Sequence, residues 1–380
     1  MKQLFVNSFG AKRFFRLLPA SIAVCAMTSF FTMCNSIVTG RILGERALIA
    51  VDCAEPLTSG VMFLAYILGI GTSIVCAKTK GAGDKKKASQ LFTQGLIAVV
   101  FCGVLASILC TLFLDELVPL LGASAEYLSM TRDLLLWTTP FLFALFLFSF
   151  LLEILISEED MQIAALASGV MIVLKLVLSI VLAKRMGLQG IGLSTTISMM
   201  AALLICCVHF FRKDNELKIA WHFNLKELFT SFKYSSNDSI YYAYCSISLF
   251  LINRFIMSHF GHGMLAVYLV IYSLQSLLTL ACDGIGGALQ PLICTYAGEG
   301  NVKGIRSTMK AALKAALLLS AALCAFLLCF AGSIPSWFGI LDPHALQETA
   351  IGIRLIAAFV VFASLNLMLN SYYTYVDQII

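Results

Sequence analysis

Charged residues are scarce in this sequence, and their scarcity excludes most soluble folds. Only 12% of the 380 residues are Asp, Glu, Lys or Arg, whereas 60% are hydrophobic and the mean hydropathy is +0.91. A soluble domain carries about 25% charged residues. Apolar runs near or above the roughly 20 residues that span a bilayer recur along the chain. The alternating segments of a membrane β-barrel are absent. The sequence therefore predicts an all-α polytopic membrane protein.

Motifs for several kinds of chemistry are also missing. No CxxC pair indicates a metal site, and no Walker motif indicates ATP as an energy source. The five histidines form no catalytic or metal-binding pattern with Ser, Asp or Cys. Most of the 13 cysteines lie inside apolar runs, where a thiol packs as a small hydrophobe. We therefore predict a protein that is not an enzyme and has no cofactor and no metal.

The apolar runs predict about ten transmembrane helices, some long enough to tilt or to extend past the membrane. They are expected at 17–40, 47–77, 88–114, 130–156, 161–183, 188–211, 236–258, 264–296, 306–331 and 345–376. The basic N-terminus followed by an apolar run also allows a cleaved signal peptide. A first transmembrane helix is preferred, because no small-residue cleavage site follows the run.

Lysine and arginine are unevenly divided between the two sides that this topology creates. Eighteen of the 26 fall in the N-terminal segment and in the connections on the same side, and seven fall on the other side. Cytoplasmic loops carry the excess of Lys and Arg. The sequence thus predicts a multi-pass protein of the plasma membrane with a cytoplasmic N-terminus.

An internal repeat appears when the chain is shifted by 217 residues. The superimposed pairs are Gly44 and Gly261, Leu48 and Leu265, Leu57 and Leu274, Gly69 and Gly286, Gly81 and Gly298, Gly83 and Gly300, and Gly122 and Gly339. Both copies begin on the cytoplasmic side, so the repeats are parallel and related by an axis along the membrane normal. Such repeats are typical of transporters, with the substrate path between the halves.

The second copy is shorter than the first. We expect an N-terminal lobe of six helices at 1–217 and an incomplete C-terminal lobe of four helices at 218–380. A full second copy would add about two spans, so the chain resembles a twelve-helix design without its last two helices.

Several stretches in order resemble the multidrug and toxic compound extrusion (MATE) transporters. They are "LLPASIA", "TGRILGERALIAV", "GIGTSIVCAKTKGAGDKKKA", "MGLQGIGLSTTIS", "LINRFIMSHFG" and "GIGGALQPLICTYAGEGN". The resemblance is greatest to the branch that contains staphylococcal-type drug exporters and DNA-damage-inducible relatives. It implies two lobes around a central cavity. It also implies export of organic, often cationic, compounds in exchange for protons or sodium. The expected partners are small organic substrates, protons or sodium, and the lipid bilayer, with no nucleic acid.

Charges at membrane depth are costly, so they are functional candidates by default. The resemblance implies an acidic residue in the first helix, where this chain has Asn35, and an Asn and an Asp in the fifth, where it has Lys175 and Ser179. Glu55 or Glu153 can replace the missing acids by pairing with Lys175. The alternatives are a static ion pair or a lysine that extends into an aqueous cavity.

The C-terminal lobe offers one acid and a set of polar aromatic residues. Asp283 lies among glycines that permit a bend or close helix approach, and we expect it either to bind a cation or proton or only to set the potential of the cavity. Tyr242, Tyr272 and Gln275 are candidates for the substrate cavity, because aromatic faces attract organic cations. The alternative is that the aromatic residues face lipid or pack between helices.

Three readings of the function follow. The first is a secondary antiporter that exports drug-like organic compounds by alternating access. The second is a flippase for a lipid-linked or amphipathic molecule, in which Lys175 attracts an anionic headgroup. The third is a truncated, inactive copy.

Overall fold

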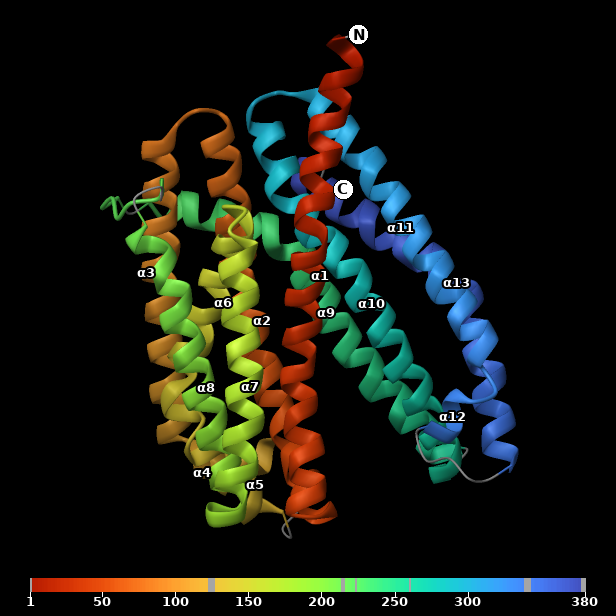
Figure 1. The fold of residues 1–380 in the computed structure, drawn as a ribbon. Coiled ribbons are helices and arrows are strands. Elements are labelled where there is room, and N and C mark those ends of the chain that lie inside the picture. Colours follow the sequence, from red (N-terminus) through yellow and green to blue (C-terminus); the bar gives the residue numbers. More distant parts are fainter. Residues whose placement is uncertain are drawn as a thin grey trace. The chain divides into compact units, whose positions relative to one another are not determined.

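The computed structural model describes residues 2–121, 127–212, 216–222, 224–259, 261–337 and 343–376. Within these ranges it describes the side chains except at 2–9, 28–37, 45–46, 48–49, 52, 55, 59, 236–243, 245–246, 249–250, 253–254, 257–258, 261–266, 269–270, 272–273, 276–282, 336–337 and 345. The described chain is helical (Figure 1).

Most of the helices follow one another with short connections, as expected for membrane spans joined by tight turns. The α-helices are α1 (Lys2–Ile42), α2 (Glu45–Gly81), α3 (Lys85–Leu112), α4 (Leu114–Leu120), α5 (Leu128–Leu136), α6 (Leu142–Ser157), α7 (Met161–Met186), α8 (Leu188–Val208), α9 (Leu225–His259), α10 (Gly261–Gly298), α11 (Val302–Phe330), α12 (Ile334–Trp337) and α13 (Pro343–Val376). Two 3-10 turns, η1 (Thr139–Phe141) and η2 (His209–Phe211), lie before α6 and after α8.

The apolar runs predicted helices at the right places. In the described residues, seven segments are long and apolar enough to cross a membrane, which confirms a helical polytopic protein. The total of about ten remains a prediction, because the spans expected at 17–40, 236–258 and 264–296 include residues whose side chains the structure does not describe. The run at 130–156 is not one helix: η1 separates α5 from α6 at Pro140, whose ring cannot sit inside a regular helix without loss of a hydrogen bond.

The two halves of the sequence repeat begin a helix in the same way. Asp84 accepts a hydrogen bond from the backbone N–H of Lys87 (2.9 Å) and caps α3. Asn301, which is 217 residues later, accepts one from the N–H of Gly304 (2.9 Å) and caps α11. Such caps satisfy backbone donors that the first turn leaves unpaired. The glycines before the caps, Gly83 and Gly300, have φ values of 90° and 65°, a region that favours glycine.

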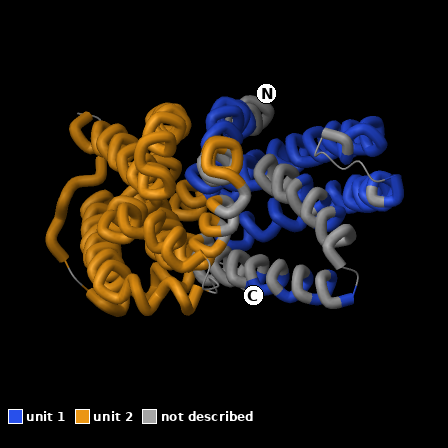
Figure 2. Tube along the Cα trace, turned by 90° about the horizontal axis from the view of Figure 1, so that it is seen from below, with its two compact units in different colours: residues 1–25, 240–293, 301–380 blue, residues 26–239, 294–300 orange. Residues whose placement is uncertain are grey.

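The chain divides into two compact units (Figure 2). Unit 1 comprises residues 1–25, 240–293 and 301–380, and unit 2 comprises residues 26–239 and 294–300. In unit 2, α7 packs chiefly on α8, while α2, α3 and α6 pack on one another. In unit 1, α11 packs on α13. The expected lobes at 1–217 and 218–380 remain a prediction.

Unit 2 contains a reciprocal contact between repeated positions. A Cβ built on Gly81 would lie 2.3 Å from the carbonyl oxygen of Thr295, and one built on Gly298 would lie 2.0 Å from the carbonyl oxygen of Lys78. The shift of 217 residues carries Gly81 onto Gly298 and Lys78 onto Thr295. The ends of α2 and α10 therefore approach one another symmetrically, which only glycine allows at both positions.

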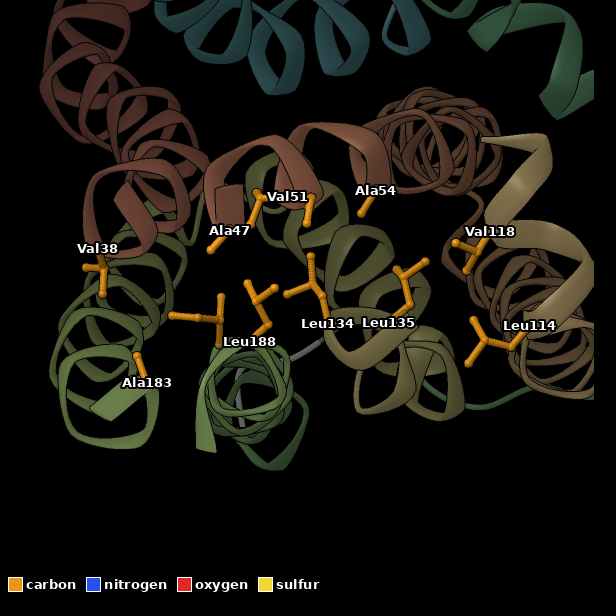
Figure 3. Close-up of a cluster of buried hydrophobic side chains, with 12 residues drawn as sticks. Val38, Ala47, Val51, Ala54, Leu114, Val118, Leu134, Leu135, Ala183 and Leu188 are labelled. Atoms are coloured by element: carbon orange, nitrogen blue, oxygen red, sulfur yellow. The ribbon is translucent and has the colours of Figure 1, made fainter. Parts of the chain in front are cut away.

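One cluster of buried apolar side chains lies at the end of unit 2 where α7 turns into α8 (Figure 3). Its buried members come from α1, α2, α4, α5, α7 and α8, and they are Val38, Ala47, Ala50, Val51, Ala54, Leu114, Val118, Leu134, Leu135, Ala183, Leu188 and Ile191. Ile191 also belongs to the polar site described next, so the apolar cluster covers that site from one end.

Candidate functional site

Lys175 lies near the middle of α7 and faces inward. At 1.5 Å per residue it is about 21 Å from the first residue of α7 and about 17 Å from the last. It shares a buried stripe with Met171, Ser179 and Ala183, spaced four residues apart. Val173 and Val177 on another face are exposed, as expected for side chains in lipid. The side chain of Lys175 is 0% exposed, so its amine does not extend into solvent in this structure.

The ammonium of Lys175 is held by oxygen atoms of α8. Nζ donates to the carbonyl oxygen of Ile191 (3.2 Å), to Ser194 Oγ (3.3 Å) and to Thr195 Oγ1. Ser194 and Thr195 also donate their own hydroxyl protons to the Ile191 carbonyl, at 2.7 and 2.9 Å. Each hydroxyl thus has lone pairs left for the lysine. The arrangement suits a positive charge, because three acceptor oxygens replace its water.

Ser179 joins the same group from the next turn of α7. Its Oγ lies 2.7 Å from Ser194 Oγ. Either hydroxyl can be the donor in this pair. Two residues that the sequence singled out, Lys175 and Ser179, therefore meet through a third that it did not. We call Lys175, Ser179, Ile191, Ser194 and Thr195 the α7–α8 cluster.

Glycines allow α8 to come close enough to form this cluster. The chain reverses at Gly187, whose φ of 61° favours glycine. A Cβ built on Gly190 would lie 2.3 Å from the carbonyl oxygen of Leu182 on α7, and one on Gly192 would lie 2.3 Å from that of Leu134 on α5. A larger residue at either position would push α8 away from its neighbours.

Glu153 and Asp283 lie on helices that approach others closely. Glu153 on α6 is partly buried, and its Cγ would be 3.3 Å from a Cβ built on Gly69 of α2. Asp283 on α10 is partly buried in unit 1. Its neighbour Gly284 would place a Cβ 2.6 Å from Ile22 of α1, which confirms that the glycines there permit close helix approach.

The remaining sequence candidates are Gln275, Asn35, Glu55, Tyr242 and Tyr272. Gln275 on α10 is exposed. Asn35, Glu55, Tyr242 and Tyr272 lie outside the residues whose side chains the structure describes. Among the described residues, no group of three His, Cys, Asp or Glu is placed to hold a metal ion.

A second cluster of charged residues lies where α2 ends, α3 begins and the chain turns from α6 into α7. Lys80 Nζ is 2.8 Å from Glu158 Oε2 and 2.9 Å from Glu216 Oε2, and Lys85 Nζ is 2.7 Å from Glu216 Oε1. The hydrogen bonds from Lys85 and Lys80 hold the pKa of the Glu216 carboxyl below its usual value. Asp160 accepts from His209 (2.8 Å) and Arg212 (3.0 Å) nearby. Sequence reasoning treated these lysines only as markers of the cytoplasmic side.

Comparison with known proteins shows which family this chain resembles. The MatE family model matches residues 19–181 and 241–376. An FAD transporter of Shewanella oneidensis is 23% identical over 80% of this chain and 69% of its own length. The multidrug export protein MepA of Staphylococcus aureus is 22% identical over 76% of this chain and 65% of its own. The chain thus spans about two thirds of the length of these curated relatives.

Solved structures show the same fold. A MATE crystal structure in a bent conformation covers 99% of this chain and 84% of its own, with 22% identity and a TM-score of 0.88. An outward-facing multidrug resistance MATE transporter of the MOP superfamily covers 99% and 85%, with 22% identity and a TM-score of 0.89. The family model matches well over half of the residues, in both halves of the repeat, so this multi-pass membrane protein belongs to the MatE family.

Proposed function

We propose that the protein is a secondary active transporter that exports organic, cationic, drug-like compounds in exchange for protons or sodium. The observation that carries this proposal is the match of the family model to both halves of the chain, 19–181 and 241–376. Two parallel repeats can alternate access to a site between them. The relationship to a multidrug export protein supports organic compounds as substrates.

A second candidate is export of an anionic flavin nucleotide. It is favoured by the FAD transporter of Shewanella oneidensis, which matches slightly more of this chain than MepA does. The two candidates differ in the charge of the substrate, because ethidium is a cation whereas FAD carries two phosphates. A single transport assay with both compounds separates them.

In this proposal Lys175 fixes α7 to α8 and does not carry the coupling ion. Its ammonium is enclosed and already held by three oxygens of one helix. A group that exchanges ions with water in each cycle must be reached by water at some stage. Asp283 and Glu153 are partly buried carboxylates, so we propose them as the coupling candidates to test.

The test is uptake of ethidium into proteoliposomes that contain the purified chain. We expect a pH gradient or a sodium gradient to accelerate uptake several-fold, and an ionophore that dissipates that gradient to remove the acceleration. FAD uptake in parallel vesicles tests the second candidate. Uptake of neither compound above protein-free vesicles under both gradients would reject both functions.

Three variants assign the coupling group. Asp283→Asn and Glu153→Gln each remove one carboxylate, and loss of the gradient dependence identifies the coupling acid. Lys175→Met is expected to keep the gradient dependence. If Lys175→Met alone abolishes gradient dependence while its protein remains monodisperse, the lysine belongs to the coupling machinery and the structural assignment is wrong.

A further inference from the structure

The connection between η2 and α9 presents apolar and basic side chains together. Ile219 and Trp221 are 68% and 83% exposed, and Leu225 and Phe229 at the start of α9 are 58% and 65% exposed. Lys218 and Lys226 are exposed between them. We call these six residues the linker surface. A group of large apolar side chains exposed together, as here, marks a protein or membrane interaction surface.

The backbone under the linker surface is fixed to α3. The N–H of Lys218 donates to Ser89 Oγ (3.2 Å), and the N–H of Ala220 donates to Thr93 Oγ1 (2.9 Å). Gln94 pairs with Asn224 in both directions: Nε2 donates to its carbonyl (2.6 Å), and Oε1 accepts from its N–H (3.3 Å). The three α3 side chains are at most 5% exposed. This segment is therefore held in a defined position with its apolar side chains outward.

The position of these anchors on α3 gives the depth of the linker surface. α3 has 28 residues and is about 42 Å long, whereas the hydrocarbon core is about 30 Å thick. About four residues at each end then lie among the headgroups. Ser89 lies at this boundary, just after Lys85–Lys87, and Thr93 and Gln94 lie about one turn deeper, at the start of the apolar run that begins at Leu91. The linker surface therefore lies at the level where headgroups meet acyl chains.

The start of α9 has the direction and pattern of an interfacial helix. In Figure 1 its first turns, in green, run crosswise to α3 and α6 of the same unit. Ser231 and Ser235 are buried on the inner face, and a Cβ on Gly71 of α2 would lie 2.1 Å from the Ser231 carbonyl oxygen. Leu225, Lys226 and Phe229 form the exposed face. Amphipathic helices of this kind lie in the plane of the interface.

We propose that the linker surface binds anionic phospholipids of the adjacent leaflet. Trp221, Ile219, Leu225 and Phe229 enter the boundary of the acyl chains, as tryptophan prefers. The amines of Lys218 and Lys226 take part in no ion pair within the described residues and reach the lipid phosphates. Basic residues near a membrane attract acidic lipids. The connection between the repeats is thereby attached both to α3 and to the bilayer.

Trp221 reports on this proposal directly. The chain has three tryptophans, so Trp137→Phe with Trp337→Phe leaves Trp221 as the only indole. This protein is reconstituted in vesicles in which either the phosphatidylglycerol or the phosphatidylcholine carries bromine atoms on its acyl chains. We expect strong quenching by brominated lipid, weak quenching by aqueous iodide, and more quenching by brominated phosphatidylglycerol at equal mole fraction. If the double variant folds poorly, the difference between the wild type and Trp221→Phe gives the same quantity.

Charge variants test the lipid preference. Lys218→Gln with Lys226→Gln should lower the apparent affinity for phosphatidylglycerol about fivefold for each lysine. The matched control is Lys184→Gln with Arg185→Gln, which changes two exposed basic residues in the last turn of α7. It should leave the lipid preference of the quenching at Trp221 unchanged. Quenching by iodide and not by brominated lipid would show a surface that faces water or a protein partner. Equal quenching by both lipids, or an unchanged preference in the lysine variant, would also overturn the proposal.

Discussion

Two lysines of unit 2 show two ways to keep a cation in a membrane protein. Lys175 is fully buried near the middle of α7 and donates to a carbonyl and two hydroxyls of α8. The side chain of Lys80, at the end of α2, is 28% exposed and contacts the carboxylates of Glu158 and Glu216. Lys175 is part of the contact between α7 and α8. Lys80 instead connects the end of α2 to the turn after α6 and to the segment after η2.

This difference shows how the free-energy cost of removing a charge from water is offset at each position. At the end of α2 water still screens the lysine, so its ion pairs contribute little unless a partner is itself buried. In the middle of α7 the cost of removing the ammonium from water must be offset by the oxygens around it. Reversal of the charge at Lys175 should therefore cost more stability than removal of the charge at Lys80.

The largest effect is expected from reversing the charge in the α7–α8 cluster. Lys175→Glu places a carboxylate against the Ile191 carbonyl oxygen, and we expect a loss of about 3–5 kcal/mol in the free energy of unfolding. Lys175→Met should cost only about 1–2 kcal/mol, because Ser194 and Thr195 keep their own bonds to that carbonyl. SDS titration of the purified proteins measures both values. Equal losses in the two variants would mean that the charge is not what the cluster accommodates.

The next largest loss of stability is expected when the close approach of α7 and α8 is disturbed. Gly190→Ala would bring a Cβ within 2.3 Å of the Leu182 carbonyl oxygen, and the forced separation should cost about 1–3 kcal/mol. Gly60→Ala is the matched control, because it lies in α2 with no atom within 4 Å of the new Cβ. Helix propensity should make that variant neutral or up to about 1 kcal/mol more stable. Similar behaviour of the two in the same titration would show that α8 can move without loss.

Removal of the other lysine should have a smaller effect. Lys80→Met leaves Glu158, whose side chain is only 6% exposed, without its 2.8 Å partner, and we expect a loss of about 1–2 kcal/mol. Lys85→Met should change stability by at most about 0.5 kcal/mol, because Lys85 is 62% exposed. A larger loss for Lys85→Met than for Lys80→Met would contradict the role given to burial.

The smallest effect should appear with pH. Lys85 and Lys80 lower the pKa of Glu216 from 4.5, so their ion pairs stabilise the protein above this pH and are lost as the pH falls through the lowered pKa. The difference in stability between the wild type and Glu216→Gln should be below about 1 kcal/mol at neutral pH and should vanish in acid. Melting temperatures of both proteins across this pH range measure it. A difference that grows towards acid pH would have the wrong sign.

The sequence predicted the helices better than the contacts between them. Hydropathy placed α3, α7, α8 and α11 within a few residues, because membrane spans are decided by local composition. The start of α3 is equally local, because the side chain of Asp84 caps it.

The α8 partners of Lys175 were not predicted. A helical pattern shows that Lys175 and Ser179 share a face, but not how the neighbouring helix is rotated. The signal was present in "LSTTIS", which has three consecutive hydroxyl residues in the largely apolar α8. Similarly, Ser89, Thr93 and Gln94 interrupt the start of α3 on one face, yet only the folded chain shows that they hold the linker.

The reciprocal contact of Gly81 and Gly298 affects how the sequence can evolve. In a symmetric homodimer each interface position occurs twice, so a substitution acts on both sides at once. Here the same kind of contact is formed within a single chain, between α2 and the end of α10. Each side can therefore mutate alone. The chain can become asymmetric at its own two-fold contact one residue at a time, a path that a dimer encoded by one sequence does not have.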